Sequence, residues 1–329
     1  MGGSGAGTLM TSPQTIGPVE RALWLRGVTP FTGLRARHLA ALGQLMREEI
    51  VPAGQAVRPL GAPWHTVRLL AEGRLRASGE DGAALVVDAP QVIGLIEQLA
   101  GRELRARLVA DSDVTILTID RAAMLHLLEE EFAVVLQVRQ ALGRSLAAWQ
   151  QQRGDWGPAV VPSAPAAPTA DLDRFVERML VLHRAPMLRA FGVAVLAGLL
   201  RDEPAQRLAA GDTLFAAGAA AERMFVVAEG RIEGMAPGGG SVRAEAGSVL
   251  GENEALIGMP YAYTAVCATP AAVLALDPRA IWDAAEDHFH VARALLAASA
   301  RQLLRLEQRV VAGFDPPPDA SQRSGQEAS

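Results

Sequence analysis

The chain has 329 residues, of which 50% are hydrophobic and 20% charged, as expected for a globular protein long enough for about two domains. All 31 basic residues are arginine, which excludes Schiff-base and pyridoxal-phosphate lysines and the lysine of a phosphate-binding P-loop. The net charge of −5, without any dense basic run, predicts no nucleic-acid partner, and the single cysteine, Cys267, excludes an intrachain disulfide.

The first half of the chain is predicted to form helices, then strands, then helices. Residues 1–16 are rich in Gly, Ser and Thr, so we expect disorder, and residues 1–12 lack the basic region and the following apolar run of a secretory signal. Apolar residues at three- and four-residue spacing predict short amphipathic helices over residues 20–45. Short apolar runs between turn formers predict strands of a jelly-roll sandwich or barrel over residues 50–120. Helical periodicity returns from residue 121 to about 152.

The second half repeats this order after a segment rich in proline and alanine. Residues 154–170 predict an extended linker, and residues 312–329 predict a disordered tail. Between them we expect helices to residue 200, strands over 207–277 and helices to 311. The predicted domains are therefore 17–153 and 171–311, each mainly β with flanking α. The most apolar stretch is about half the ~20 residues of a membrane span, so we expect a cytoplasmic protein without membrane insertion.

The two halves are copies of one domain-sized unit. When the sequence is shifted by 157 residues, Glu72-Gly73-Arg74 aligns with Glu229-Gly230-Arg231, and the register holds without a gap over more than a hundred positions. Further aligned pairs are Gly54 with Gly211, Gly61 with Gly218, Gly94 with Gly251, Asp120 with Asp277 and Phe132 with Phe289.

Each copy resembles the cyclic nucleotide-binding domain family. In the second copy the likeness is carried by residues 214–218 and 224–232 and by residues 251–260, which look like the phosphate-binding cassette of that family. Residues 52–54, 70–74 and 94–110 make the same match more weakly in the first copy. The resemblance implies two tandem β jelly rolls, with a cyclic nucleotide as a possible ligand and no other cofactor.

The resemblance also implies which residues would bind that ligand. The cassette binds the phosphate through backbone N–H groups and an arginine, and the ribose 2′-hydroxyl through a glutamate that follows the cassette glycine. The arginine comes ten or eleven places after the glycine. The first copy keeps this arginine but has Leu95 in place of the glutamate, whereas the second keeps the glutamate but has no arginine. Neither cassette is complete. The candidate ligand-binding residues are Gly94, Arg105, Gly251, Glu252, Asn253, Tyr261 and Ala262.

The final helix carries a heptad pattern. The seam consists of Ala292, Leu296, Ser299, Leu303, Leu306 and Val310. Arginines interrupt the matching seam of the first copy at Arg139 and Arg153. Two alternatives are open: the helix packs on its own β-domain, or residues 283–311 pair with a second chain in a homodimer.

No catalytic or metal site is predicted. His288 and His290 are two residues apart, a spacing that points side chains of a helix in different directions. We therefore predict a non-enzymatic regulatory or protein-interaction module with an unidentified protein partner. Alternatives are a genuine cyclic-nucleotide sensor, with the ligand in the second domain, and a regulatory chain acting in trans on a kinase or transporter. A transcription factor is disfavoured because only the predicted disordered tail follows the last helix.

Overall fold

The computed structural model describes residues 17–29, 31–59, 64–79, 84–102, 106–153, 171–200 and 204–310. These residues form two compact units, one from residues 17–93 with 106–127 and the other from residues 94–102 with 128–310. The predicted disordered ends and the predicted linker lie outside the described residues. The domain limits of 17–153 and 171–311 stay a prediction.

The first unit is built from two antiparallel sheets, in the strand orders β1-β8-β3-β6 and β2-β7-β4-β5. Two helices precede the sheets, and Arg21 of α1 ties them to β1 through a 2.8 Å hydrogen bond to the Met46 carbonyl and an ion pair with Glu48. The elements are α1 (Pro18–Arg26), α2 (Ala36–Leu45), β1 (Arg47–Val51), β2 (Ala56–Arg58), β3 (Thr66–Glu72), β4 (Arg74–Ser78), β5 (Ala84–Asp88), β6 (Gln91–Ile93), β7 (Arg107–Ala110) and β8 (Val114–Asp120).

The second unit contains two more antiparallel sheets, in the orders β10-β15-β12-β13 and β14-β11-β16-β9. Its strands are β9 (Gln206–Leu208), β10 (Thr213–Phe215), β11 (Met224–Glu229), β12 (Arg231–Met235), β13 (Ser241–Glu245), β14 (Val249–Leu250), β15 (Thr264–Cys267) and β16 (Ala271–Leu276). The predicted fold class, two tandem jelly rolls with flanking helices, is confirmed.

The helices of the second unit come from both copies of the repeat. They are α3 (Leu95–Ala100), α5 (Phe132–Arg153), α6 (Phe175–Arg184), α7 (Val193–Leu199), α8 (Glu252–Ile257), α9 (Pro278–Asp287) and α10 (Phe289–Val310). The remaining helix, α4 (Arg121–Glu130), runs from the first unit into the second.

A tight turn explains the Glu-Gly-Arg signature of both copies. Gly73 and Gly230 join consecutive strands with φ of +87° and +83°, in the left-handed region. A Cβ at Gly73 would clash with the Asp113 carbonyl, and a Cβ at Gly230 would clash with the Pro270 carbonyl. Only glycine fits this turn, because the conformation and the close backbone approach both exclude a side chain.

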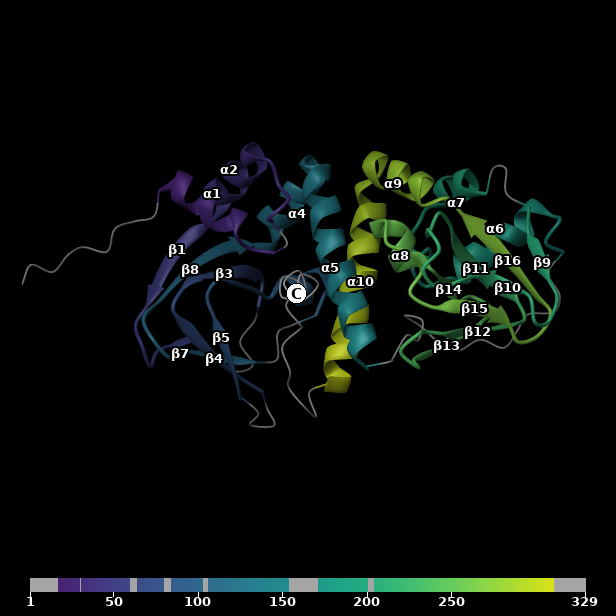
Figure 1. Ribbon diagram of the computed structural model, residues 1–329. Coiled ribbons are helices and arrows are strands. Elements are labelled where there is room, and N and C mark those ends of the chain that lie inside the picture. The colour runs from purple at the N-terminus through teal and green to yellow at the C-terminus, as the bar shows by residue number, and fades with distance from the viewer. Residues whose placement is uncertain are drawn as a thin grey trace, which may run out of the picture. The chain divides into compact units, whose positions relative to one another are not determined.

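The two long helices pack against cassette helices, each on that of the other copy. Under the 157-residue shift, α3 corresponds to α8 and α5 corresponds to α10. Helix α10 packs against α3, and α5 packs against α8, while α5 and α10 run side by side (Figure 1). The two copies thus exchange their final helices.

The heptad seam of α10 is buried within a single chain. Its described side chains are those of Ala292, Leu296, Ser299, Leu303 and Leu306, all of them buried. The main partners of α10 are α3, α5 and α9, so the helix packs mainly on other helices of the chain. The heptad pattern left two alternatives open, packing on the β-domain of the same copy and pairing with a second chain. Neither of them describes a helix that packs mainly on other helices of its own chain. The homodimer through residues 283–311 stays a prediction. In the described part of the chain, no helix has the length and apolar character needed to cross a membrane.

Candidate functional site

The second cassette begins at a glycine that cannot be replaced without strain. Gly251 precedes α8 with φ of +70°, and a Cβ there would lie 2.6 Å from the Tyr261 ring. In the first copy Gly94 precedes α3 with φ of +84°. Both copies therefore share the left-handed turn that starts the cassette helix. Arg105 lies outside the described residues.

The interior of the second barrel is filled with aromatic side chains. Tyr261 stands at one of the two positions where the family resemblance expects an arginine, and its ring stacks on Phe215 with centroids 4.0 Å apart. Phe225 and Tyr263 lie 5.8 and 5.3 Å from the same phenylalanine ring. We call Phe215, Phe225, Tyr261 and Tyr263 the aromatic cluster; all four belong to the buried core of this barrel.

The two tyrosine hydroxyls of this cluster bond to the protein itself. The Tyr261 hydroxyl donates to the Arg223 carbonyl at 2.6 Å, and the Tyr263 hydroxyl accepts from the Gly251 N–H at 3.4 Å. Burial raises the pKa of both tyrosines, so the hydroxyls stay neutral. The first N–H of the cassette is thus engaged by Tyr263.

The second cassette also holds two acidic side chains, of which Glu254 is buried and Glu252 is partly exposed. Burial raises the pKa of Glu252 to about 7; repulsion from Glu254 adds to the shift, and the charge of Arg139 opposes it. Burial likewise raises the pKa of Glu254, against hydrogen bonds from backbone N–H groups that include Ala262. Ala262, the second position expected to hold an arginine, therefore contacts the cassette through its backbone.

Arg139 of α5 reaches this cassette from the first copy of the repeat. Its Nη1 donates to the Asn253 side-chain oxygen at 3.1 Å, and the Asn253 side-chain nitrogen donates to the Gly143 carbonyl at 3.0 Å. Both side chains are buried. Burial lowers the pKa of Arg139 to about 10, and the charges of Glu252 and Glu254 oppose that shift. Asn253, predicted as a ligand-binding residue, here binds α5.

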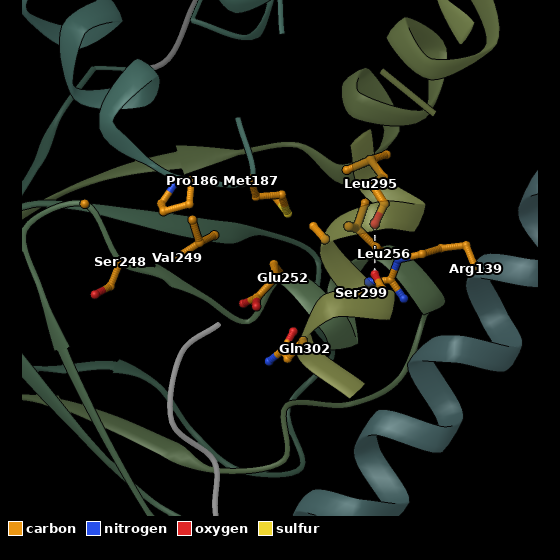
Figure 2. Close-up of a pocket in the computed structure, with 12 residues that line it drawn as sticks. Arg139, Pro186, Met187, Ser248, Val249, Glu252, Leu256, Leu295, Ser299 and Gln302 are labelled. Atoms are coloured by element: carbon orange, nitrogen blue, oxygen red, sulfur yellow. Dashed lines mark hydrogen bonds between the residues drawn. The ribbon is translucent and has the colours of Figure 1, made fainter. Parts of the chain in front are cut away.

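A small cavity lies beside these groups. Figure 2 shows the Arg139 side chain extending from α5 toward Leu256 and Ser299, with Glu252 also lining the cavity. The cavity holds about 30 Å³, whereas pockets for small-molecule ligands are roughly 300–1,000 Å³. It has room for one or two water molecules, not for a nucleotide.

Sequence reasoning missed the role of Arg139, although the signal was present. The arginine was visible as a break in the apolar seam of the first copy, where the second copy has Leu296. A charged residue in an apolar seam needs a buried partner. The partner, Asn253, is more than a hundred residues away in sequence, so no local pattern could identify it.

The two histidines lie closer together than their spacing predicted. His288 ends α9 and His290 lies in the first turn of α10, so they do not share one continuous helix, and their ring centroids are 5.7 Å apart. The argument that the two side chains diverge was therefore wrong. Among the described residues, no three potential metal ligands of the types His, Cys, Asp and Glu come together.

Comparison with solved structures gives several matches, all with low TM-scores. The regulatory domain of Toxoplasma gondii PKA, solved with cAMP, is 14% identical over 88% of this chain and 95% of its own, with a TM-score of 0.32. The regulatory subunit of a cAMP-independent protein kinase A from Trypanosoma brucei is 15% identical over 79% and 84%, with a TM-score of 0.31. The N-terminal domain of a transcriptional regulator from Streptomyces coelicolor A3(2) is 30% identical over 41% and 99%, with a TM-score of 0.34. Scores this low carry no information on what this chain binds.

Comparison of the sequence with protein families gives one match. No curated protein matches the chain. The model of the cyclic nucleotide-binding domain matches residues 205–288, which span the strands of the second copy, its cassette and most of α9. Residues 205–288 are therefore similar to a cyclic nucleotide-binding domain.

Proposed function

We propose that the chain is a non-enzymatic regulatory or protein-interaction module in the cytoplasm, and that its second cyclic nucleotide-binding fold works without a nucleotide. The observation that carries this proposal is the stacking of Tyr261 on Phe215, 4.0 Å apart in the core of the barrel. A ring that is 5% exposed holds the position where an arginine would meet the phosphate. A ligand would have to displace this ring, and the tyrosine side chain has no positive charge to offer the phosphate in return.

The groups around the cassette support the same proposal. The Gly251 N–H is engaged by Tyr263, and Asn253 is engaged by Arg139 and Gly143. A ligand would compete with these internal hydrogen bonds, which are already formed at no cost in binding entropy. The cassette is therefore held in one state by its own chain.

This state would give the protein a fixed surface for its partner. In a ligand-driven domain, the helices that follow the barrel respond to ligand by a shift between two populations. Here the cassette helix α8 packs against α5, and α5 packs against α10. We propose that the unidentified protein partner recognises this fixed set of helices.

One observation favours a second candidate, a genuine cyclic-nucleotide sensor. The second copy keeps the cassette glycine with its left-handed turn, and Glu252 follows it directly. In this alternative the ligand would move the aromatic cluster on binding.

Calorimetry of the full chain with cyclic AMP, cyclic GMP and cyclic dinucleotides separates the two candidates. We expect no heat of binding at micromolar ligand; binding by the wild-type chain would overturn the proposal and support the sensor. Ala262→Arg tests whether only a charge is missing. If this variant stays folded and binds a cyclic nucleotide, the aromatic cluster does not close the site, and this part of the proposal is wrong.

A further inference from the structure

We infer that the chain carries two equivalent docking surfaces for an acidic protein segment with apolar side chains, one on α1 of the first unit and one on α6 of the second. These surfaces are separate from the second cassette and from the helices α5, α8 and α10, so the inference goes beyond the proposed function. It holds whether or not the second cassette binds a nucleotide.

The two helices expose the same pair of apolar residues. Under the 157-residue shift, Val19 and Leu23 of α1 align with Val176 and Leu180 of α6. The exposed fractions are 73% and 61% in the first pair, and 64% and 47% in the second. Residues four apart lie on the same face of a helix, so each helix presents a valine and a leucine side by side to solvent.

These apolar side chains do not hold the helices on their own units. Each helix is anchored by a leucine on another face, Leu25 in α1 and Leu182 in α6, and both of these leucines are fully buried. The anchor comes two residues after the exposed leucine, which places it about 200° around the helix axis. The packing of each helix therefore gives no reason for the exposed pair.

The pair is shared by the copies although its neighbours have changed. The positions that differ between α1 and α6 include Pro18 and Phe175, Ala22 and Met179, and Trp24 and Val181. Single exposed apolar residues are common on protein surfaces, and they need no explanation. The same exposed pair at equivalent positions of two copies indicates a contact that both copies make with another molecule.

The segments around both pairs are basic. Residues 17–43 and the equivalent residues 174–200 each contain four arginines and one glutamate, which gives each segment a net charge of +3. The whole chain has a net charge of −5. The two segments are therefore positive regions of an acidic protein.

Most of these arginines are available to a partner. The exposed ones are Arg26, Arg35 and Arg37 in the first unit and Arg174, Arg184 and Arg189 in the second. Within the part of the chain that the structure describes, none of them forms an ion pair. Arg26 comes three residues after the exposed leucine of α1, and Arg184 comes four residues after that of α6. At these spacings each apolar face continues into an exposed arginine.

An acidic helix with apolar side chains fits such a surface. Its apolar side chains would cover the valine and the leucine, and its carboxylates would face the arginine that follows them. An anionic lipid surface would also attract the arginines. However, two apolar side chains form a much smaller face than that with which amphipathic helices enter a membrane, so we favour a protein segment.

The test is calorimetry of the full chain with a synthetic amphipathic helical peptide that carries leucines on one face and glutamates on the other. We expect saturable binding of two peptides per chain. Leu23→Glu and Leu180→Glu should each remove one of the two sites, because each places a negative charge in one apolar surface, and the double variant should bind no peptide. Met235→Glu, at a methionine of β12 that is 59% exposed, is the matched control and should keep both sites.

Two further measurements test the charge of the partner. Arg184→Gln should weaken binding at the α6 site by up to about fivefold, which is the effect of one exposed charge pair, and added salt should weaken both sites. A peptide with glutamine in place of every glutamate should bind more weakly than the acidic peptide. Vesicles of anionic phospholipid should not bind the chain.

Several results would overturn the inference. They are no saturable binding of the acidic peptide, a stoichiometry of one peptide per chain, sites that survive in the double variant, equal affinity for the two peptides, and binding to the anionic vesicles. Circular dichroism checks that each variant is folded. If a leucine variant is not folded, Val19→Glu or Val176→Glu at the adjacent exposed valine takes its place. No nucleotide is present in these titrations, so their outcome is independent of the titrations that test the proposed function.

Discussion

The Nη1 of Arg139 and the side-chain oxygen of Asn253 lie 3.1 Å apart and join the last helix of the first copy to the cassette helix of the second. The 157-residue shift relates these positions to Leu296 and Ile96, both apolar. The contact between α5 and α8 therefore contains a polar pair, whereas the matching positions of α10 and α3 hold apolar residues. Buried polar pairs of this kind can fix the register of packed helices.

The first prediction concerns the coupling of this pair. Arg139→Leu removes the donor and should cost about 1–3 kcal/mol of unfolding free energy, since Asn253 loses a buried partner. Asn253→Ile should cost at least as much, because it leaves a buried charge without that acceptor. The double variant should cost less than the sum by about 0.5–3 kcal/mol. Urea unfolding followed by circular dichroism measures all three.

The control for this cycle is Arg144→Leu, at an exposed arginine of the same helix whose Nη2 lies 3.5 Å from Gln140. It should combine additively with Asn253→Ile. Additive costs for Arg139→Leu and Asn253→Ile would mean that the two side chains stabilise the protein independently of each other.

The second prediction concerns the glycine beneath this pair. A Cβ at Gly143 would lie 2.6 Å from the Arg139 Nη1, 2.7 Å from the Ile257 Cγ2 and 2.9 Å from the Asn253 Oδ1. Alanine normally stabilises a helix interior by about 1 kcal/mol relative to glycine. Here the crowding should exceed this gain, so Gly143→Ala should lower the unfolding free energy by about 1–3 kcal/mol.

Gly198 of α7 provides the matched control, because a Cβ there would meet nothing within 4 Å. Gly198→Ala should be neutral or stabilising in the same urea titration. If Gly143→Ala is as well tolerated as Gly198→Ala, then α5 does not approach α8 as closely as these distances require.

The sequence predicts the barrels well because the glycines that mark their turns act locally. Gly73 and Gly230 each serve one turn between adjacent strands, so the repeat of a short motif locates the strands on either side. The glycines Gly94 and Gly251 likewise mark the turns at which the two cassette helices begin, so the sequence also locates these helices.

What the sequence could not predict is the set of partners that only the folded chain brings together. The sequence shows that Tyr261 stands where an arginine is expected, so it predicts the loss of a charge. It does not predict that the Tyr261 ring stacks on Phe215 in the core of the barrel. Arg58 ends a three-residue strand, too short for alternation to show which side chains face the core. The partner of Arg139 lies on a helix of the other copy.

The third prediction tests how the seam of α10 is covered. Leu303 is 1% exposed in a single chain, so Leu303→Glu would bury an unpaired charge and should lower the melting temperature by several degrees or more. The molar mass measured by light scattering should equal that of the wild-type chain. Leu180→Glu, at a leucine of α6 that is 47% exposed, is the control and should change neither quantity. A wild-type dimer that Leu303→Glu converts to folded monomers would instead support the homodimer through residues 283–311.

The last prediction follows from the raised pKa of Glu252. The folded protein holds this proton to about pH 7, whereas the unfolded chain releases it near pH 4.5. Between these values the unfolded state binds fewer protons than the folded state, so the unfolding free energy falls as pH rises and then levels off above about pH 7. Glu252→Gln removes this contribution and should raise the unfolding free energy at about pH 8 by about 1–3 kcal/mol, with little change at about pH 4.

Glu254, whose pKa is also raised, keeps part of the pH dependence in that variant. Removing an exposed carboxylate from β13 by Glu245→Gln should not alter the slope. Equal pH profiles for Glu252→Gln and wild type would show that the Glu252 carboxylate is solvated in the folded protein and that Arg139 does not face a buried charge there.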